Sequence, residues 1–540
     1  MPHNESLNWY EDSLAPQERK IRGHFSTPPL LVNRILDACG YTADADLSRL
    51  RVLDPACGSG NFLAGAVLRM LASGKQRGLE PRHVLASLQR NIWGFDSDPV
   101  ACFLAEMQVH TLLQEQGIEG ITHRKGDKYP YRLHIHQADG LTLPWEQKRR
   151  EHVDLFLANP PYLAAKNADL SGYRSAQGLG QVDSYLLFLR LALQVVRPDG
   201  WIGLVLPDPV LARANATRER QRLLEETTVH HLWHLANVFP AYVGAAVIIA
   251  QKRPPQRVHQ IAWVREKWGT RETISTHRGQ GVSVPSIAQT LLLSQPGAEL
   301  RYLLNDEHDT LVNRLHRTIA KADGVHNFVP LNHFVSIRRG EELGKKSVLL
   351  THTLPDEQGW HPLLRGGVDV RPYGTPQGHC WIAEAAIGKP LARYRAPKLL
   401  VVKSTNMLQA ALDTQGYVAL QTLYLLTLNG DTEVELQRHT SDTLYFLLAI
   451  LNSRLMQRYV YVLHTAYKLV QPQIEQHVLA RLPIPVVAVQ ERREIIERAK
   501  KIVVACSNAS SVVELKQQIT LLCDEQERAI CALYENAISM

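Results

Sequence analysis

The chain has 540 residues, too many for one compact domain, and this length predicts two or three. With 45% hydrophobic and 21% charged residues and no run of about 18 apolar residues, it is expected to be a soluble globular protein without a membrane anchor. Residues 1–20 are polar and acidic rather than a signal peptide, which favours a cytoplasmic location. The seven cysteines contain no C-x-x-C pair, which argues against a disulfide framework or a structural zinc site. The net charge of +7 is compatible with a polyanionic partner but does not by itself indicate one.

The N-terminal half alternates apolar β-type runs with helical stretches, the pattern of an α/β sheet. A helix is expected first, from Thr27-Pro28-Pro29 to about Cys39. Strands are then expected at residues 51–53, 92–95, 134–136, 153–157 and 201–206, and a closing hairpin at 230–235 and 243–250. The pattern ends near Lys252-Arg253-Pro254-Pro255, so we predict one domain over residues 1–255 and another over 256–540.

The second half is expected to be an α+β domain with a helical C-terminus. Short strands are predicted at 398–403, 409–412 and 423–428. One long amphipathic helix is predicted at 442–463, and two further helices at 491–505 and 512–534 are predicted to pair as a hairpin.

A glycine-containing turn, Asp54-Pro55-Ala56-Cys57-Gly58-Ser59-Gly60, follows the first strand of the sheet. Glycines there let the backbone turn sharply and approach a ligand closely. Asp96 and Asp139 follow the second and third strands, and each by itself could be a solvated strand end or a turn residue. Three acids at the carboxyl ends of three successive strands favour a ligand site, because open α/β sheets bind ligands at that edge.

The most informative motif, Asn159-Pro160-Pro161-Tyr162, follows the fourth strand. An exocyclic amino group is a poor nucleophile because its lone pair is delocalised into the ring. Two acceptors on its hydrogens, the Asn159 side-chain oxygen and the Pro160 carbonyl, would favour an sp³-like nitrogen, and the two prolines would hold these acceptors in place. Tyr162 would stack on the base. A rigid turn with Tyr162 as packing is the simpler alternative.

At this motif the chain resembles the amino-methylating nucleic-acid methyltransferases. His24-Phe25-Ser26-Thr27-Pro28 is similar to the F-x-T-P segment that precedes the glycine motif in the gamma class of N6-adenine DNA methyltransferases, the TaqI-like enzymes of type II restriction-modification systems. The resemblance implies a Rossmann-like class I methyltransferase domain with a seven-stranded mixed sheet, followed by a target-recognition domain. It also implies S-adenosyl-L-methionine as cofactor, with no metal, and duplex DNA as partner.

The resemblance also assigns site residues. Thr27 and Pro28 would contact the cofactor, and the turn from Asp54 to Gly60, with Ala56 and Gly58, would hold its methionine part. Asp96 would bind the ribose hydroxyls, Asp139 the adenine amino group, and Phe156 would pack near that adenine. The remaining assignments concern the target base and the catalytic loop: Asn159, Pro160, Pro161, Tyr162 and Phe239.

Phe239 lies in Asn237-Val238-Phe239-Pro240, which matches the family's V-F-P element, and it would stack on an adenine flipped out of the duplex; a core aromatic at a strand end is the alternative. Residues 166–181 could contact DNA or be a solvated loop. In the C-terminal half, candidates for phosphate or base-edge contacts are Arg338, Arg339, Lys345, Lys403, Ser404 and Thr405, although a solvated charged face explains any one of them.

Other functions share part of this pattern. An RNA or a protein-glutamine amino-methyltransferase would use the same loop, and cytosine N4 is chemically possible. A non-catalytic DNA-binding specificity subunit would not need a cofactor pocket. Since no nuclease motif is evident, we expect any restriction endonuclease or defence partner to be a separate protein, and a location at the nucleoid of a prokaryotic cell.

Overall fold

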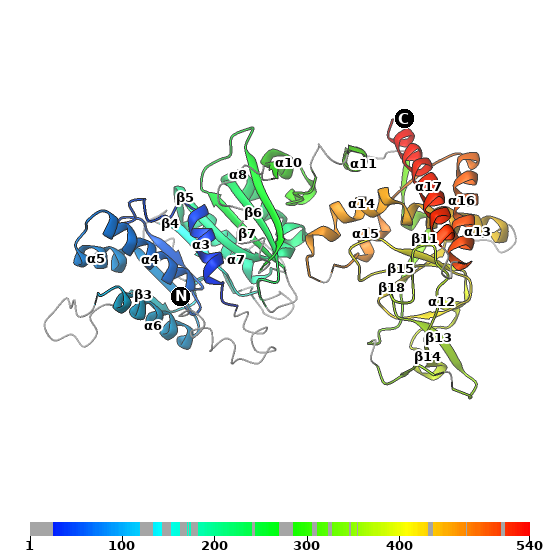
Figure 1. Cartoon of the computed structure of the whole chain (residues 1–540), viewed down its shortest axis with the longest axis horizontal. Coiled ribbons are helices and arrows are strands. Elements are labelled where there is room, and N and C mark those ends of the chain that lie inside the picture. Colours follow the sequence, from blue (N-terminus) through cyan, green and yellow to red (C-terminus); the bar gives the residue numbers. More distant parts are fainter. Residues whose placement is uncertain are drawn as a thin grey trace. The chain divides into compact units, whose positions relative to one another are not determined.

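The computed structural model describes residues 25–118, 133–142, 153–162, 170, 172–173, 182–239, 244–268, 285–304, 310–321, 327–344, 347–353, 355–429, 436–470, 472–508 and 513–539. The chain divides into two compact units, Met1–Tyr302 and Leu303–Met540. Figure 1 shows the elements of each unit. The first unit continues past residue 255, where the sequence placed a domain edge, because two more strands join the same sheet.

The first unit is built on a nine-stranded sheet with the order β3-β2-β1-β4-β5-β7-β6-β8-β9. The first five strands of that order are parallel, and β7 runs antiparallel to both of its neighbours. The strands are β1 (Val52–Asp54), β2 (Ile92–Asp96), β3 (His134–Gln137), β4 (Val153–Ala158), β5 (Val196–Pro207), β6 (Thr228–Ala236), β7 (Ala245–Gln251), β8 (Gln260–Lys267) and β9 (Ser286–Ala288). The mixed sheet expected from the sequence is confirmed, and β8 and β9 extend it from seven strands to nine.

The helices of the first unit pack around this sheet. They are α3 (Pro29–Ala38), α4 (Asn61–Gln76), α5 (Pro81–Asn91), α6 (Pro99–Glu115), α7 (Ser184–Val195), α8 (Thr217–Glu226) and α10 (Gln289–Leu293). Local chemistry sets where α6 begins, because Pro99 stands at its first position and the Asp98 carboxylate accepts a hydrogen bond from the backbone N–H of Val100 at 2.9 Å. The core below the helices is formed by buried side chains such as Leu31, Phe62 and Leu157.

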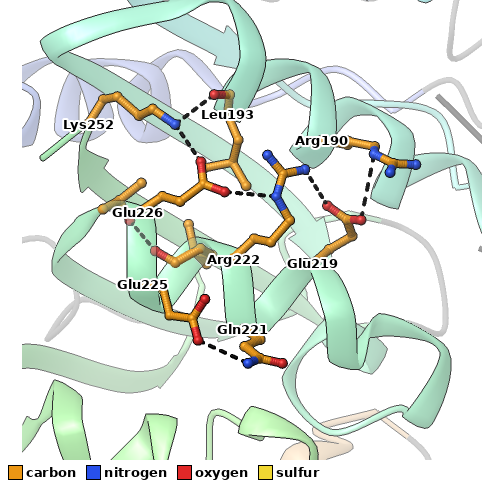
Figure 2. A network of polar contacts seen from close by, with 10 residues as sticks. Arg190, Leu193, Glu219, Gln221, Arg222, Glu225, Glu226 and Lys252 are labelled. Atoms are coloured by element: carbon orange, nitrogen blue, oxygen red, sulfur yellow. Dashed lines mark hydrogen bonds and ion pairs between the residues drawn. The ribbon is translucent and has the colours of Figure 1, made fainter. Parts of the chain in front are cut away.

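An ion-pair network fixes α8 against α7 and the end of β7 (Figure 2). Glu219 is completely buried and lies between Arg190 at 3.9 Å and Arg222 at 3.5 Å. Arg222 and Lys252 both pair with Glu226, at 2.8 and 2.6 Å. The Arg190–Glu219 pair joins α7 to α8 and the Lys252–Glu226 pair joins the segment after β7 to α8, whereas both pairs of Arg222 lie within α8.

The second unit combines small sheets with a helical bundle. Its sheets have the orders β11-β18-β15-β16, β12-β14-β13-β17 and β10-β19. The strands are β10 (Phe328–Pro330), β11 (Val335–Arg339), β12 (Leu350–Thr351), β13 (Trp360–Leu364), β14 (Cys380–Ala383), β15 (Lys398–Val402), β16 (Ala410–Asp413), β17 (Val418–Ala419), β18 (Leu423–Leu428) and β19 (Pro483–Pro485). The helices are α11 (Thr310–Lys321), α12 (Ala392–Arg395), α13 (Leu436–Asn452), α14 (Arg454–Leu463), α15 (Gln476–Ala480), α16 (Val489–Asn508) and α17 (Val513–Ser539).

The helices of the second unit differ from the sequence prediction in two respects: α11, α12 and α15 were not predicted, and one predicted helix is divided. The helix expected over residues 442–463 is two helices, because Ser453 is in an extended conformation and caps α14 through a hydrogen bond from the Met456 N–H. The α16–α17 pair is as expected, and a hydrogen bond from Gln526 to the Ile495 carbonyl at 3.1 Å joins its two helices. Among the described helices, none has the length and apolar character needed to cross a bilayer.

Candidate active site

A pocket of about 190 Å³ lies at the carboxyl edge of the parallel strands. Asp54 and Asp96 are the last residues of β1 and β2, and Asn159 directly follows β4. Asp139 follows β3 by two residues. Of the predicted site residues, the pocket is lined by Thr27, Asp54, Ala56, Gly58, Asp96, Asp139, Asn159 and Pro161. The topology of the sheet therefore brings together residues that are separated by more than a hundred positions in the sequence.

The turn between β1 and α4 depends on glycine. Gly58 and Gly60 have φ angles of 52° and 93°, in the left-handed region that disfavours side chains. A Cβ on Gly60 would also lie 2.8 Å from the Ala105 side chain on α6. The Gly58 N–H donates to the Asp96 carboxylate at 2.9 Å, which ties the turn to the end of β2. The backbone is thus held close to the space where a ligand would lie.

The pocket gathers three carboxyl groups and no cation from the described residues. Asp54 is buried, and burial together with the nearby charge of Asp96 raises its pKa to about 8. Its side chain accepts a hydrogen bond from the Ala56 N–H at 3.1 Å. Such a pocket favours a ligand that carries positive charge.

Asp139 sits where β3 approaches the glycine turn. Its carboxylate accepts hydrogen bonds from the Leu141 N–H at 2.9 Å and from the Tyr173 hydroxyl at 2.6 Å. Burial, followed by the contact with Asp139, raises the pKa of Tyr173 to about 12. Gly140 leaves no room for a side chain, since a Cβ there would lie 2.1 Å from the Pro55 carbonyl oxygen. The chain at Asp139 is therefore packed directly on the turn that follows β1.

The segment before α3 closes another side of the pocket. The Ser26 and Ser59 hydroxyls are 2.9 Å apart, and the Asn61 amide donates to the Thr27 carbonyl at 2.9 Å. The Thr27 hydroxyl is buried and lines the pocket, and no described residue hydrogen-bonds to it. A buried hydroxyl without a partner beside three carboxyl groups fits a polar, cationic ligand such as S-adenosylmethionine.

Asn159 is oriented by this same segment. Its side-chain N–H donates to the Phe25 carbonyl at 2.5 Å, and its side-chain oxygen accepts from the Tyr162 hydroxyl at 3.1 Å. The Ser184 hydroxyl at the start of α7 donates to the Pro161 carbonyl. Burial raises the pKa of Tyr162 well above its usual range, so its hydroxyl stays protonated. The loop is thus held at Asn159, Pro161 and Tyr162.

Three aromatic rings meet beside Asn159. The ring centroids of Tyr162 and Phe239 are 6.4 Å apart, with the planes at 76°, and Phe25 lies 6.5 Å from the first and 5.8 Å from the second. The structure thus places the two aromatic residues predicted to hold the target base next to each other.

Other predicted residues lie outside the lining of the pocket. Gly60 is the N-cap residue of α4, and Pro28 is the N-cap residue of α3. Phe156 is completely buried within β4, opposite Leu53 of β1 and Ile202 of β5. Pro160 is buried and Tyr162 half-buried beside the pocket. Of the loop at 166–181, Leu170, Gly172 and Tyr173 are described. The candidates Lys166 and Arg174 lie outside the described residues, as does Lys345 in the second unit.

The pocket is also lined by residues that the sequence did not assign to the cofactor site, among them Phe25, Leu141, Leu170 and Tyr173. Leu141 lies two residues after Asp139, a proximity that could have pointed to it. The sequence predicts Phe25 only as part of a motif, and Tyr173 only as a residue that could contact DNA.

The sheet, the glycine turn and the acidic carboxyl edge together define a class I methyltransferase fold with a cofactor pocket. More specifically, residues 8–273 match the family described as N-6 DNA Methylase, and residues 361–484 match the TaqI-like C-terminal specificity domain. These two matches give the chain an N-6 DNA methylase domain followed by a TaqI-like specificity domain, as the sequence motifs predicted.

The chain is also similar to individual proteins. It is 25% identical over 228 residues to the type II methyltransferase M.BstVI of Geobacillus stearothermophilus, covering 41% of this chain and 40% of that protein. It is 26% identical over 233 residues to the type II methyltransferase M.VspI of Vibrio sp. (strain 343), covering 42% and 47%. The matches therefore span less than half the length of these relatives.

Two solved structures share the fold over most of the chain. The type IIL restriction-modification enzyme MmeI in complex with DNA has a TM-score of 0.60 at 12% identity, covering 98% of this chain and 78% of that chain. A DrdV–DNA complex has a TM-score of 0.54 at 12% identity, covering 95% and 61%.

Proposed function

We propose that the protein transfers a methyl group from S-adenosylmethionine to the N6 amino group of an adenine in duplex DNA. The observation that carries the proposal is the position of Asn159, which lines the cofactor pocket at the end of β4 and has aromatic rings beside it. The family match and the type II methyltransferases among the relatives support the choice of adenine in DNA.

The residues of the loop prepare the target nitrogen. The Asn159 amide is fixed by its N–H bond to Phe25, so that its oxygen is the atom left to accept a hydrogen bond from the amino group. The Pro160 carbonyl supplies a second acceptor, and the two prolines restrict the backbone around it. These acceptors act by preorganised hydrogen bonding rather than as strong bases.

When bound, the cofactor supplies an electrophilic methyl group on a positively charged sulfur. The Asn159 oxygen and the Pro160 carbonyl would hold the two amino hydrogens of the adenine, so that the nitrogen lone pair faces this methyl group as it leaves the sulfur, and the extra proton on the methylated nitrogen would then pass to water. Asp54 and the turn to Gly60, with Ala56 and Gly58, would hold the methionine part of the cofactor. Asp96 would bind the ribose hydroxyls.

The adenine end of the cofactor would lie against Asp139. Thr27, with its unpartnered hydroxyl, and Pro28 would close this side of the chain over the cofactor. Leu141 lines the pocket and could supply the apolar contact to the adenine that the sequence reading assigned to Phe156, whose side chain lies within the sheet.

The target base would enter between Tyr162 and Phe239. Their rings now touch edge to face, so a flipped adenine must separate them and also share or replace the Tyr162 hydroxyl on the Asn159 oxygen. Extruding the base costs roughly a few kcal/mol, which stacking on the two rings would offset.

The biological setting is part of the proposal. We expect duplex DNA as the partner, cytoplasmic action at the nucleoid, and a role in restriction-modification or phage defence. The two solved neighbours are DNA complexes, which supports a DNA partner for this chain. A separate endonuclease would supply any cleavage.

Single-molecule sequencing of DNA from cells that express the chain tests the proposal. Wild-type protein should leave N6-methyladenine at one sequence, and Asn159→Ala or Tyr162→Ala should lower methyl transfer by about a hundredfold or more while cofactor affinity changes little. The exposed Asn33→Ala on α3 is the matched control and should retain activity. Methylation of structured RNA or of protein glutamine in preference to duplex DNA, or undiminished transfer by Asn159→Ala, would contradict the assignment.

A further inference from the structure

The sheet β11-β18-β15-β16 of the second unit brings two cations to one edge. Strands β11 and β15 both pair antiparallel with β18, so their carboxyl ends lie on the same side. Arg339, the last residue of β11, lies opposite Tyr424 of β18, and so does Val401 near the end of β15. Lys403 directly follows β15. Arg339 and Lys403 therefore flank the start of the same strand.

A third cation reaches this edge from the segment after α14. The Ile474 N–H donates to the Lys403 carbonyl at 2.9 Å, and the Ile474 carbonyl accepts from the Tyr424 hydroxyl at 3.0 Å. These bonds hold Ile474 against the two strand ends, and the ion pair of Lys468 with the adjacent Glu475 brings Lys468 to the same edge. Burial first, and then the charges of Arg339 and Lys468, lower the pKa of Lys403. Lys403 is thus close enough to both Arg339 and Lys468 for their charges to act on it.

Negative charge at this edge does not balance the cations. Glu475 is the nearby acid, and it pairs with Lys468 at 2.5 Å. Within the described part of the chain, neither Lys403 nor Arg339 has a carboxylate within 4.0 Å, and Lys403 is half-buried. Holding such groups together costs free energy in the isolated protein, and a bound anion would recover that cost.

We propose that Arg339, Lys403 and Lys468 form a phosphate clamp that grips one phosphate of the DNA backbone. Lys403 is anchored through both of its backbone groups, since its N–H donates to the Thr422 carbonyl at 2.9 Å and its carbonyl accepts from Ile474. An anchored cation at a fixed sheet edge positions a duplex but does not read its sequence. The clamp rests on the proposed function, because it presumes a DNA partner.

The test measures how DNA affinity depends on salt. Fluorescence anisotropy of two 30-base-pair duplexes of unrelated sequence is titrated with wild-type protein and with the Arg339→Gln/Lys403→Gln double variant over a range of salt concentrations. Loss of one phosphate contact lowers the slope of log affinity against log salt by about 0.9, and both duplexes should weaken equally. Lys501→Gln, an exposed lysine on α16, is the matched control and should leave the slope unchanged. Melting curves and cofactor titrations confirm that the variants are folded.

Each outcome separates the clamp from the proposed function. An unchanged slope in the double variant, or a loss confined to one duplex sequence, overturns the clamp even if adenine is methylated. A reduced slope on both duplexes supports the clamp even if no methylated adenine is found, and then the proposed reaction is what fails. Wild-type protein that binds neither duplex overturns the clamp as well.

Discussion

At the scale of single residues, the buried carboxyl of Asp54 makes the cofactor pocket sensitive to pH. Its pKa of about 8 lies above the usual 3.8 because burial and Asp96 disfavour the charged form. The folded protein without ligand therefore binds a proton there more tightly than the unfolded chain does. The contribution of the protonated Asp54 carboxyl to folding stability is complete below about pH 4 and is lost as the pH rises through 8. A cationic ligand acts in the opposite direction, since it favours the ionised carboxylate.

Cofactor affinity should accordingly rise between pH 6 and 8 and level off above about 8, approaching tenfold per pH unit where Asp54 is protonated. Calorimetric titration with S-adenosylmethionine in buffers of different ionisation enthalpy measures both the affinity and the proton released. Asp54→Asn should bind weakly with no such dependence. Asp98→Asn, which keeps the helix cap of α6 outside the pocket, should behave like the wild type. A dependence that persists in Asp54→Asn would assign it to another group.

Four of the pocket residues that the sequence predicts lie at the carboxyl ends of strands. Asp54, Asp96, Asp139 and Asn159 each come at a strand end, so period and chain order were enough to gather them. Phe25 and Tyr173 could not be predicted in the same way, because their places depend on contacts with Asn159 and Asp139 across distant parts of the chain.

At the scale of elements, the fit between the segment after β3 and the turn after β1 is tight enough to test. A Cβ at Gly140 would lie 2.1 Å from the Pro55 carbonyl oxygen and 2.7 Å from the Pro55 Cβ. Gly140→Ala must therefore push the two segments apart. We expect it to lower the free energy of unfolding by about 1–3 kcal/mol and to weaken cofactor binding, because Pro55 belongs to the turn that forms the pocket.

Gly172→Ala is the matched control, since a Cβ there meets nothing within 4 Å. Its unfolding free energy should stay within about 0.5 kcal/mol of wild type. Thermal unfolding and cofactor titration of both variants make the comparison. Equal behaviour of the two alanine variants would mean that the contact between Gly140 and Pro55 relaxes without cost.

The elements themselves were predictable where the local pattern decides them. The hairpin of β6 and β7 and the α16–α17 pair follow from apolar periodicity. The continuation of the sheet into β8 and β9 could not be predicted in this way, because Lys252-Arg253-Pro254-Pro255 resembles a linker. Strand β8 joins the sheet by pairing with β6, which the local pattern does not show. The break at Ser453 is a capping effect inside a continuous apolar pattern, which periodicity overlooks.

At the scale of the whole molecule, the two units divide the proposed work. Every described residue of the cofactor pocket belongs to Met1–Tyr302, and the phosphate clamp belongs to Leu303–Met540. The match to the N-6 DNA Methylase family ends at residue 273, and the match to the specificity domain begins at 361. The change of rhythm along the sequence predicts two domains, but the edge that it places at residue 255 differs from the end of the first unit at Tyr302.

This division predicts additive effects on catalysis. Asp139→Asn should raise the KM for the cofactor, because it weakens the carboxylate that accepts bonds from Leu141 and Tyr173, and should leave the KM for DNA nearly unchanged. Lys403→Gln should raise the KM for DNA and leave the KM for the cofactor nearly unchanged. Since the two residues share no partner, their free-energy effects on kcat/KM should sum to within about 0.5 kcal/mol in the double variant. The measurement is steady-state methylation of one duplex by the wild type, the two single variants and the double variant. A deviation larger than this in either direction would show that binding of the cofactor in one unit affects binding of DNA in the other.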